Sequence, residues 1–465
     1  MTNEQIHIVY FIGIGGIGMS ALARWFNING KQVYGYDRTE TPLTRKLTDE
    51  GIEIHYEDDP NQIPAALSGQ LDKTLVIYTP AVPKDHRELN YLKETGVVIK
   101  KRAEVLGWIT REYYTVAVAG THGKTTTSSM IAHLLLIGAR NPVALLGGIM
   151  QEYESNLILN SNRNTRSIAV VEADEYDRSF LHLHPDIAIV TSADADHLDI
   201  YGKRLHLIES IKEFISRIDR KGMLILKEDL QHDLSTAPGL KCETYGLDSG
   251  NCQAKKIRIE DGSFYFDYHG IGKVIRNIRL DMPGYHNVEN AVAAITACLT
   301  IGLNQLEILG GLASYKGVKR RFEYLIRTPK LVYIDDYAHH PTEVHALLTS
   351  VKSLYPGKKI TAIFQPHLFS RTRDFADGFA KSLDQADEVI LLDIYPAREQ
   401  PIEGVGSQMI MDRMEHAHVQ LCKDNMLLSC LKNSKPEVLL TIGAGDIDRF
   451  VEPIAGMLRK KYHYE

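Results

Sequence analysis

The sequence of 465 residues has few cysteines, no basic leader and no long hydrophobic run near its start. The five cysteines are scattered and form no Cys-x-x-Cys pair, which excludes a disulfide framework and favours a reducing compartment. Glycines interrupt the first apolar segment, so we predict neither a secretion signal nor a membrane-spanning helix there. We therefore expect a cytoplasmic protein that does not associate with a membrane.

An excess of basic residues is also absent. The net charge of -6 provides no positive field for a polyanion, so we do not expect nucleic acid as a partner. Any phosphate site must then be local and built from specific residues. The composition, 44% hydrophobic and 24% charged, is typical of a globular protein. At roughly 150 residues per domain, the length predicts about three domains.

Strand and helix patterns alternate along the chain, which predicts an α/β fold with parallel sheets. Predicted strands cover residues 7–12, 31–36 and 75–78 in a first, Rossmann-like domain (residues 1–110). A central P-loop ATPase-like domain (residues 111–322) has predicted strands at 115–119, 167–171 and 186–191. We expect a small antiparallel insertion between residues 221 and 279. A third, Rossmann-like α/β domain (residues 323–465) has predicted strands at 331–335, 359–364, 388–392 and 438–442.

A glycine-containing loop joins the strand at 115–119 to a predicted helix at 128–135. In such a loop, backbone amides turn toward phosphate oxygens, a lysine neutralises the β- and γ-phosphates, and a hydroxyl can bind Mg²⁺. The full eight-residue pattern has glycine where this chain has Val118, so the loop is a shortened variant. The alternative is an incidental strand-to-helix turn. The loop consists of Gly120, Thr121, His122, Gly123, Lys124, Thr125 and Thr126.

Carboxylates follow the next two predicted strands of the central domain. Glu172, Asp174, Glu175 and Asp177 come after residues 167–171. Carboxyl ends of parallel strands face the ligand crevice, and hard oxygens there suit Mg²⁺. The competing interpretation is a solvated acidic loop.

A second acidic segment follows residues 186–191, and it contains His197 between Asp196 and Asp199. The histidine can ligate a second metal ion or position a carboxylate. A purely structural histidine is the alternative.

The N-terminal glycines fit the Gly-x-Gly-x-x-Gly pattern between a strand and a helix, and Asp37 follows the last of them by nineteen residues. Such a loop accepts a pyrophosphate, and Asp37 can accept hydrogen bonds from a ribose. NAD and the diphosphate of a UDP-sugar fit equally well, and composition does not decide between them. The loop is Gly13, Ile14, Gly15, Gly16, Ile17 and Gly18, and a turn of Thr79, Pro80 and Ala81 follows the strand at 75–78.

Several polar segments lie further along the chain. Asn287 and Asn290 can contact a nucleotide base or simply cap and pack a helix. Arg321, in the basic segment 317–323, can reach a transferring phosphoryl group or belong to a solvated linker. Histidines and arginines at two strand ends of the third domain suit carboxylates and phosphates. The histidines and the arginine are His339, His367 and Arg371, and Asp336 and Tyr337 belong to the first of these two strand-end segments.

Taken in order, these segments resemble the Mur ligase family of peptidoglycan synthesis, and the match spans nearly the whole chain. The most specific motifs are the glycine loop at 13–18 and the segments 119–127, 171–175, 196–199, 286–291, 317–322 and 336–341. Seven motifs in the family's order are not expected by coincidence. The resemblance implies three domains, of which the first binds a UDP-sugar, the second ATP and the third the amino acid.

The resemblance also implies roles for individual residues. Lys124, Glu172, His197 and Arg321 would be catalytic, and Thr125, Glu172 and His197 would hold Mg²⁺, with two ions expected. ATP would contact residues 120–126, Asn290, Arg321 and Asp336. The UDP-sugar would contact residues 13–18, Asp37 and the turn Thr79, Pro80 and Ala81. The amino acid and the reacting carboxylate would lie near Tyr337, His339, His367 and Arg371.

The implied reaction is ATP-dependent. It joins L-alanine to the lactyl carboxylate of UDP-N-acetylmuramic acid through an acyl phosphate. Two features depart from relatives: Leu368 stands where a basic residue is common, and Lys212 stands where some relatives carry a carbamoylated lysine, a modification that we do not expect here. The alternatives are a ligase that attaches a recycled tripeptide to the same sugar, an NAD-dependent oxidoreductase and a silent nucleotide-binding scaffold. We expect a monomer or homodimer.

Overall fold

The protein is described by a computed structural model that covers residues 3–159, 167–194, 204–234, 239–260, 262–397, 399–415, 418–432 and 434–462. The chain divides into two compact units, which are described one at a time. Unit 1 comprises Met1–Lys255, Asp267–Ile278 and Glu289–Tyr315. Unit 2 comprises Lys256–Phe266, Arg279–Val288 and Lys316–Glu465.

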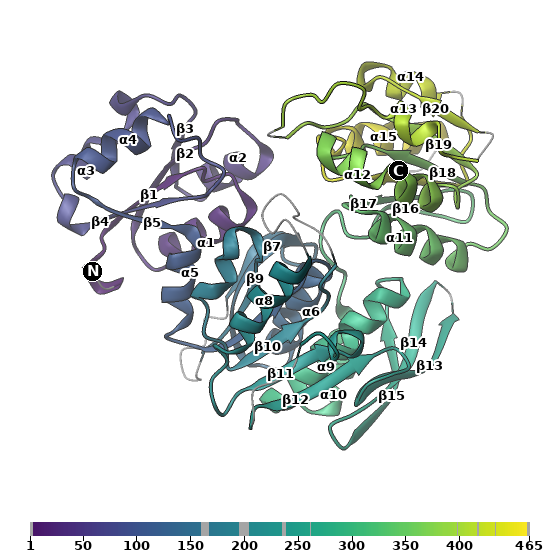
Figure 1. The fold of residues 1–465 in the computed structure, drawn as a ribbon, viewed down its shortest axis with the longest axis horizontal. Helices are drawn as coiled ribbons and strands as arrows, with labels where there is room; N and C mark the ends of the chain where they lie inside the picture. The colour runs from purple at the N-terminus through teal and green to yellow at the C-terminus, as the bar shows by residue number, and fades with distance from the viewer. Residues whose placement is uncertain are drawn as a thin grey trace. The chain divides into compact units, whose positions relative to one another are not determined.

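The N-terminal part of unit 1 is a five-stranded parallel sheet in the order β3-β2-β1-β4-β5 (Figure 1). This is a doubly wound order, whose switch point lies beside β1, between β1 and β4. The predicted Rossmann-like topology is confirmed. The strands are β1 (Ile8–Ile12), β2 (Gln32–Tyr36), β3 (Glu53–His55), β4 (Thr74–Tyr78) and β5 (Val98–Lys101). The helices are α1 (Ile17–Ile28), α2 (Pro42–Asp49), α3 (Ala65–Ser68), α4 (Arg87–Glu94) and α5 (Arg102–Thr110).

The second sheet has ten strands in the order β15-β14-β13-β12-β11-β10-β6-β9-β7-β8. Strand β6 lies between β10 and β9 and is parallel to both, whereas β8 is antiparallel to β7. The strands are β6 (Tyr114–Ala119), β7 (Asn141–Met150), β8 (Ser155–Leu159), β9 (Ser167–Ala173), β10 (Ile187–Val190), β11 (Met223–Lys227), β12 (Lys241–Gly246), β13 (Cys252–Glu260), β14 (Ser263–Gly270) and β15 (Lys273–Leu280).

The expected insertion starts later than predicted. Strands β11 and β12 pair in parallel with the central strands and continue that sheet, so they are not part of an antiparallel insertion. The connection from β14 to β15 has only two residues, Ile271 and Gly272, which is too short for a parallel crossover and therefore makes an antiparallel hairpin. The helices of this region are α6 (Lys124–Ile137), α8 (Arg204–Ile215), α9 (Tyr285–Ile301) and α10 (Gln305–Ser314).

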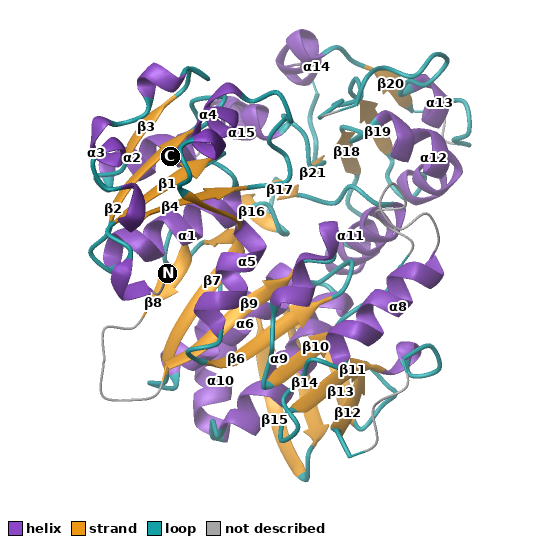
Figure 2. Cartoon of the chain, turned by 60° about the vertical axis from the view of Figure 1, so that its left-hand side comes forward, coloured by secondary structure: helices purple, strands orange, loops and turns teal. Residues whose placement is uncertain are grey.

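Helix packing joins the two sheets of unit 1. Helix α6 packs against β6, β7 and β9, and α1 packs against β7 and β8 (Figure 2). One cluster of buried apolar side chains extends from the N-terminal sheet, with Phe11 and Ile77, to the central sheet, with Val171 and Val190. Burial of this shared core stabilises unit 1 as one body.

Unit 2 contains a six-stranded sheet in the order β16-β17-β21-β18-β19-β20. The expected α/β sheet is present, but its edge strand β16 is antiparallel to β17, so the sheet is mixed. The strands are β16 (Glu323–Arg327), β17 (Val332–Asp336), β18 (Ile360–Phe364), β19 (Glu388–Leu391), β20 (Val419–Leu421) and β21 (Val438–Ile442). The helices are α11 (Pro341–Leu354), α12 (Phe369–Leu383), α13 (Gln408–Met411), α14 (Leu427–Lys432) and α15 (Asp448–Tyr462).

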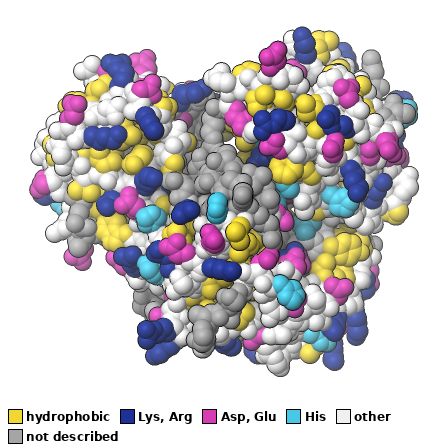
Figure 3. Space-filling view, viewed as in Figure 1, with side chains coloured by type: hydrophobic (Ala, Val, Ile, Leu, Met, Phe, Trp, Pro, Cys, Tyr) yellow, Lys and Arg dark blue, Asp and Glu magenta, His cyan; other side chains and the backbone are white. Residues whose placement is uncertain are grey.

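The surface and the helices agree with the composition. Acidic and basic side chains are interspersed over the face drawn in Figure 3, without a large area of one sign. Within the described ranges, no helix combines the length and apolar character needed to cross a membrane.

Candidate functional site

The predicted phosphate loop lies at the carboxyl end of β6 and leads directly into α6. Gly120 and Gly123 have φ values of +125° and +83°, which side-chain-bearing residues rarely adopt. A Cβ atom on Gly120 would lie 2.3 Å from the Thr191 hydroxyl oxygen, and one on Gly123 would lie 2.7 Å from Asn290 Oδ1. Both glycines are therefore required by the backbone conformation and by close neighbours, as expected for a loop that wraps an anion.

Lys124, the first residue of α6, has its ammonium group between a carbonyl and a carboxylate. Its Nζ donates to Gly120 O at 2.6 Å and to Glu175 at 2.7 and 2.9 Å. Burial lowers the pKa of Lys124, but the charges of Glu175 and Asp174 outweigh that effect and leave the pKa above its ordinary value. The lysine is thus a fixed, permanent cation at the mouth of the loop.

Thr125 and Glu172 form the next contact. The Thr125 hydroxyl donates to Glu172 Oε2 at 3.0 Å, and Glu172 Oε1 accepts the Gly147 amide at 2.6 Å. Glu172 lies inside β9, paired with Val118 of β6, and not after the strand as predicted. A hydroxyl beside a carboxylate is the hard-oxygen pair that suits Mg²⁺, which completes its shell with water and phosphate oxygens.

Residues that follow the carboxyl end of β10 also form hydrogen bonds with the phosphate loop. The Ser192 hydroxyl accepts the His122 amide at 2.7 Å, and Thr191 Oγ1 donates to His122 O at 2.5 Å. The Asp194 amide donates to Thr121 Oγ1 at 3.1 Å. Sequence analysis missed Thr191 and Ser192; their position directly after a buried strand was the available signal.

The predicted metal site consists of Thr125, Glu172 and His197. His197, with Asp196 and Asp199, falls outside the described residues. Among the described residues, no group of three or more His, Cys, Asp or Glu side chains could hold a metal ion by itself. The described part of the predicted metal site is therefore the pair Thr125 and Glu172.

A cavity of about 370 Å³ connects the two predicted nucleotide loops within unit 1. Gly16 and Gly18 of the N-terminal loop line it together with Lys124 and Glu172. At its side, Arg102 of α5 donates to Asp174 Oδ2 at 3.3 Å. The remaining lining residues are Ile17, Met19, Leu22, Thr79, Ala81, Leu106, Leu145, Leu146 and Gly147. Arg102 had no predicted role, and Asp174 was predicted only as one of the carboxylates suited to Mg²⁺.

The N-terminal glycine loop lies between β1 and α1, at the switch point of its sheet. Gly13 has φ +85°, and a Cβ atom there would lie 3.1 Å from Thr79 Cγ2 in the turn after β4. The two predicted UDP-sugar segments thus lie side by side. Asp37 Oδ2 accepts the Gly15 amide at 2.7 Å, so this carboxylate already shapes the loop.

In unit 2, Arg321 precedes β16 and lies close enough to Asp336, the last residue of β17, for its charge to act on that carboxylate. The Asp336 carboxylate accepts the amides of Phe322 and Ala338 at 2.7 and 2.8 Å. Burial raises the pKa of Asp336 to about 6, although the Arg321 charge opposes this rise. The Arg321 guanidinium lies over the Tyr337 ring, 5.1 Å from its centroid. Asp336 is the last residue of β17, so its position at a strand end is as predicted.

The other predicted residues of the third domain also gather in unit 2. The rings of His339 and His367 are 6.0 Å apart, and Arg371, which is buried, has its guanidinium 3.3 Å from His367 Nδ1. His367 also stacks on Tyr395, which the sequence analysis missed. Leu368, which the family resemblance singled out, has φ +72° at the start of α12, a strained conformation for leucine.

These features define a class: an α/β nucleotide-binding enzyme, with a glycine-rich phosphate loop that faces a second diphosphate-type loop across one cavity. Comparison with known proteins is specific. Residues 8–114 match the Mur ligase family catalytic domain, residues 118–298 the Mur ligase middle domain, and residues 320–445 the Mur ligase glutamate ligase domain. The chain belongs to the Mur ligase family, so the prediction of the family is confirmed. Mur ligases use ATP, as predicted for this chain.

Individual relatives agree with the family. A UDP-N-acetylmuramate–L-alanine ligase from Flavobacterium johnsoniae is 50% identical over 460 residues, which cover 99% of this chain and 100% of that relative. The crystal structure of UDP-N-acetylmuramate-alanine ligase from Thermotoga maritima is 29% identical, with a TM-score of 0.81 over 97% of this chain and 99% of that one. A murein peptide ligase from Psychrobacter arcticus shares the fold at 22% identity, with a TM-score of 0.69 over 97% of this chain and 98% of that one.

Proposed function

We propose that this chain is an ATP-dependent ligase that joins L-alanine to the lactyl carboxylate of UDP-N-acetylmuramic acid in peptidoglycan synthesis. One observation carries the proposal. A single cavity is lined by the glycine loop after β1 and by Lys124 and Glu172 of the phosphate loop region. A UDP-sugar held by the first loop would present its carboxylate to a phosphoryl group held by the second, and the relative that shares half of its residues is named for this reaction.

The proposed chemistry has two steps. A lactyl carboxylate oxygen attacks the γ-phosphorus of ATP, the bond to the β-γ bridging oxygen breaks, and ADP leaves. The L-alanine nitrogen then attacks the acyl carbon, phosphate leaves with the electrons of the C–O bond, and the nitrogen loses a proton. Negative charge develops on phosphoryl oxygens in the first step, so fixed cations near them supply most of the catalysis.

Lys124 is the cation that the described residues place at the phosphate loop. Its orientation is set by Gly120 O and Glu175, so little reorganisation is needed when charge develops. We assign Thr125 and Glu172 to Mg²⁺, because their oxygens are hard and adjacent. When bound, Mg²⁺ neutralises charge on phosphate oxygens. His197 and a second ion remain part of the proposal.

The remaining predicted residues are assigned to the nucleotide, to the amino acid with its acceptor carboxylate, or to the UDP-sugar. We assign Asn290 to the nucleotide, because its side chain lies against Gly123 in unit 1. In unit 2, we assign Arg321 and Asp336 to ATP, and Tyr337, His339, His367 and Arg371 to the amino acid and its acceptor carboxylate. Asp37 acts on the UDP-sugar by fixing the Gly15 amide, and the turn Thr79, Pro80 and Ala81 borders the same ligand. Domain boundaries near residues 110 and 322 and action in the cytoplasm belong to the same proposal.

Two alternatives predict different substrates. A tripeptide-attaching ligase would use the same sugar, but the murein peptide ligase from Psychrobacter is 22% identical to this chain, whereas the alanine ligase from Flavobacterium johnsoniae is 50% identical. The NAD-dependent oxidoreductase alternative rested on the first glycine loop and Asp37. The family consists of ligases, which favours a UDP-sugar in that loop.

The proposal is tested by measuring phosphate release with ATP, Mg²⁺ and UDP-N-acetylmuramic acid, with L-alanine or the tripeptide added separately. We expect rapid release that depends on L-alanine and on the sugar. Lys124→Ala should abolish this release while the UDP-sugar still binds, because the two loops are separate structures. Release that follows only the tripeptide would support the recycling ligase, and tighter binding of NAD than of the UDP-sugar would support the oxidoreductase.

A further inference from the structure

A second cavity of unit 1 lies on the opposite side of α5 from the cavity assigned to substrates. It has a volume of about 360 Å³. Arg102 and Leu106 of α5 line the first cavity, whereas Glu104, Val105 and Trp108 line the second. The helix is therefore a wall between the two. The second cavity is lined by Ile6, Leu75, Val98, Lys100, Glu104, Val105, Gly107, Trp108, Arg111 and His182.

Its position in the sheet separates it from the proposed reaction. Leu75 lies near the amino end of β4, whereas Thr79, which lines the first cavity, follows the carboxyl end. Thr79 is four positions beyond Leu75 along the chain, which corresponds to about 13 Å at about 3.3 Å per residue of strand. Substrates of doubly wound sheets bind at carboxyl ends, so the second cavity is not an extension of the substrate site.

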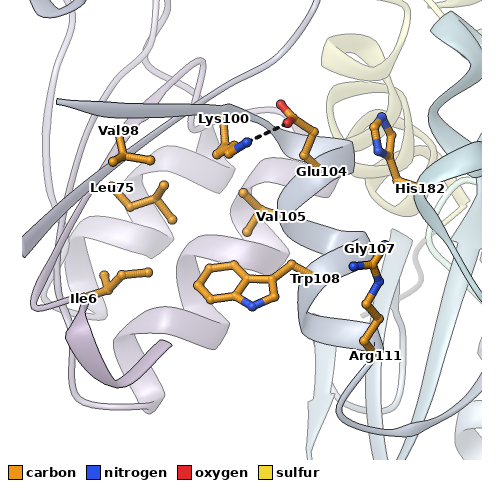
Figure 4. A pocket seen from close by; sticks show the side chains of 10 residues that line it. All are labelled: Ile6, Leu75, Val98, Lys100, Glu104, Val105, Gly107, Trp108, Arg111 and His182. Carbon is orange, nitrogen blue, oxygen red and sulfur yellow. Dashed lines mark hydrogen bonds and ion pairs between the residues drawn. The ribbon is translucent and has the colours of Figure 1, made fainter. Parts of the chain in front are cut away.

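The lining combines an apolar interior with a charged rim (Figure 4). Ile6, Leu75 and Val105 are buried, and the Trp108 ring is half-buried beside them. An aromatic face of this kind favours a flat apolar body. The interior thus matches a small hydrophobic ligand in size and character.

The rim carries one cation, Arg111, that has no ion pair with a carboxylate among the described residues. Lys100 is paired with Glu104 at 3.0 Å. Burial alone would raise the pKa of Glu104, but hydrogen bonds from the Lys101 amide and the Lys100 ammonium lower it below its ordinary value, so this pair is charged and self-compensated. Arg111 instead contacts His184 Nε2 at 3.2 Å, and no carboxylate of the described residues lies within ion-pair distance of it. Burial and Arg111 itself lower the pKa of His184, so that ring is a neutral partner.

We propose that this cavity is a second ligand site, which takes a small amphipathic anion with a flat apolar body against Trp108 and an acidic group on Arg111. The proposal does not depend on the ligase reaction. Helix α5 links the site to the substrates. A Cβ atom on Gly107 would lie 2.4 Å from His182 O, so α5 packs directly on the segment η4 (Tyr176–His182) that follows Glu175. An occupant that shifts α5 would also shift Arg102 and its contact with Asp174.

The test uses the fluorescent aromatic sulfonate 1-anilinonaphthalene-8-sulfonate on the full chain, with ATP and a UDP-sugar at saturation so that the nucleotide sites are filled. The chain has two tryptophans, and Trp25 is buried in the core. In a Trp25→Phe variant, Trp108 is the sole indole and reports binding directly. We expect saturable binding of one probe per chain with quenching of Trp108. If Trp25→Phe does not fold, loss of the quenching in Trp108→Phe serves the same purpose.

Variants decide whether the probe occupies this cavity. Arg111→Ala should weaken binding about tenfold, as for loss of one charge-assisted hydrogen bond. Val98→Phe should abolish binding by filling the cavity while turnover is retained. Lys93→Ala removes an exposed cation of α4 and should bind as the unchanged chain does. The proposal is overturned if nucleotides displace the probe completely, or if Arg111→Ala and Val98→Phe bind like Lys93→Ala.

Discussion

The ammonium nitrogen of Lys124 lies 2.7 Å from Glu175 Oε2, and the glutamate side chain is only 2% exposed. A buried carboxylate of this kind both holds the lysine in place and keeps it protonated. We therefore propose that Glu175 is a positioning residue, which would act on phosphate through Lys124. This relationship connects the acidic segment after β9 to the phosphate loop after β6.

Glu175→Gln should lower kcat at neutral pH by about tenfold, through loss of the fixed lysine orientation. The pH profile is more specific. The pKa of Lys124 is above its ordinary value because acidic neighbours outweigh burial, so the protonated form persists far into alkaline pH. Without the Glu175 charge, burial lowers that pKa, and the alkaline limb of kcat should move to lower pH. Glu213→Gln, which breaks an exposed pair with Arg217, is the control. An unchanged alkaline limb in Glu175→Gln would contradict this role.

Thr125→Ala should weaken the apparent affinity for Mg²⁺ about tenfold, because it removes one hard oxygen ligand beside Glu172. Thr125→Ser retains the hydroxyl and should restore most of the affinity. The measurement is a titration of turnover with Mg²⁺ at saturating ATP. Equal Mg²⁺ dependence in the alanine and serine variants would rule out the proposed ligand.

Gly123→Ala should severely weaken ATP binding, since its φ of +83° strains an alanine and the added Cβ would lie 2.7 Å from Asn290 Oδ1. Gly310→Ala is the matched control, because this helical glycine has open space around its Cβ position. Binding of ATP is followed by calorimetry. We expect no loss in the control, and ATP affinity unchanged in Gly123→Ala would refute the cradle assigned to this loop.

Glu88 makes stability depend on pH. Its buried carboxylate accepts hydrogen bonds from the Tyr10 hydroxyl at 2.6 Å and the Asp59 amide at 3.2 Å. Burial raises the pKa of Glu88 to about 7 from 4.5, so the folded chain binds this proton more tightly than the unfolded chain does. Stability should therefore fall as pH rises from about 4.5 to about 7. Glu88→Gln should flatten this decline in Tm, whereas Glu94→Gln, at an exposed position of α4, should keep it. A decline of equal slope in Glu88→Gln would exclude Glu88 as its source.

The sequence alone was enough to locate the strands and loops whose conformation depends mainly on neighbouring residues. Strands of continuous apolar residues, such as β1, and glycine loops between strand and helix follow from pattern and backbone freedom. The sequence also placed Lys124 in the loop that follows β6, as the parallel α/β order suggests, whereas Glu172 lies inside β9 and not after it.

Contacts between distant segments could not be derived in this way. Nothing in the local pattern assigns Glu175 rather than Asp174 to Lys124, because that choice depends on how the segment after β9 folds back. Likewise, the hydrogen bond from the Gly15 amide to the Asp37 carboxylate was not predicted, and the contact of Asp37 with a ribose stays a prediction. The parallel pairing of β11 and β12 was missed because short alternating runs also suit antiparallel strands.

The central claim is that ATP cleavage activates a carboxylate for amide formation with L-alanine. The most direct measurement uses UDP-N-acetylmuramic acid with both lactyl carboxylate oxygens labelled with ¹⁸O, together with ATP, Mg²⁺ and L-alanine, and analyses the products by mass spectrometry. The account predicts one ¹⁸O in each released phosphate and one in the carbonyl of the new amide. Phosphate without ¹⁸O, or release of phosphate without formation of the alanyl product, would contradict it.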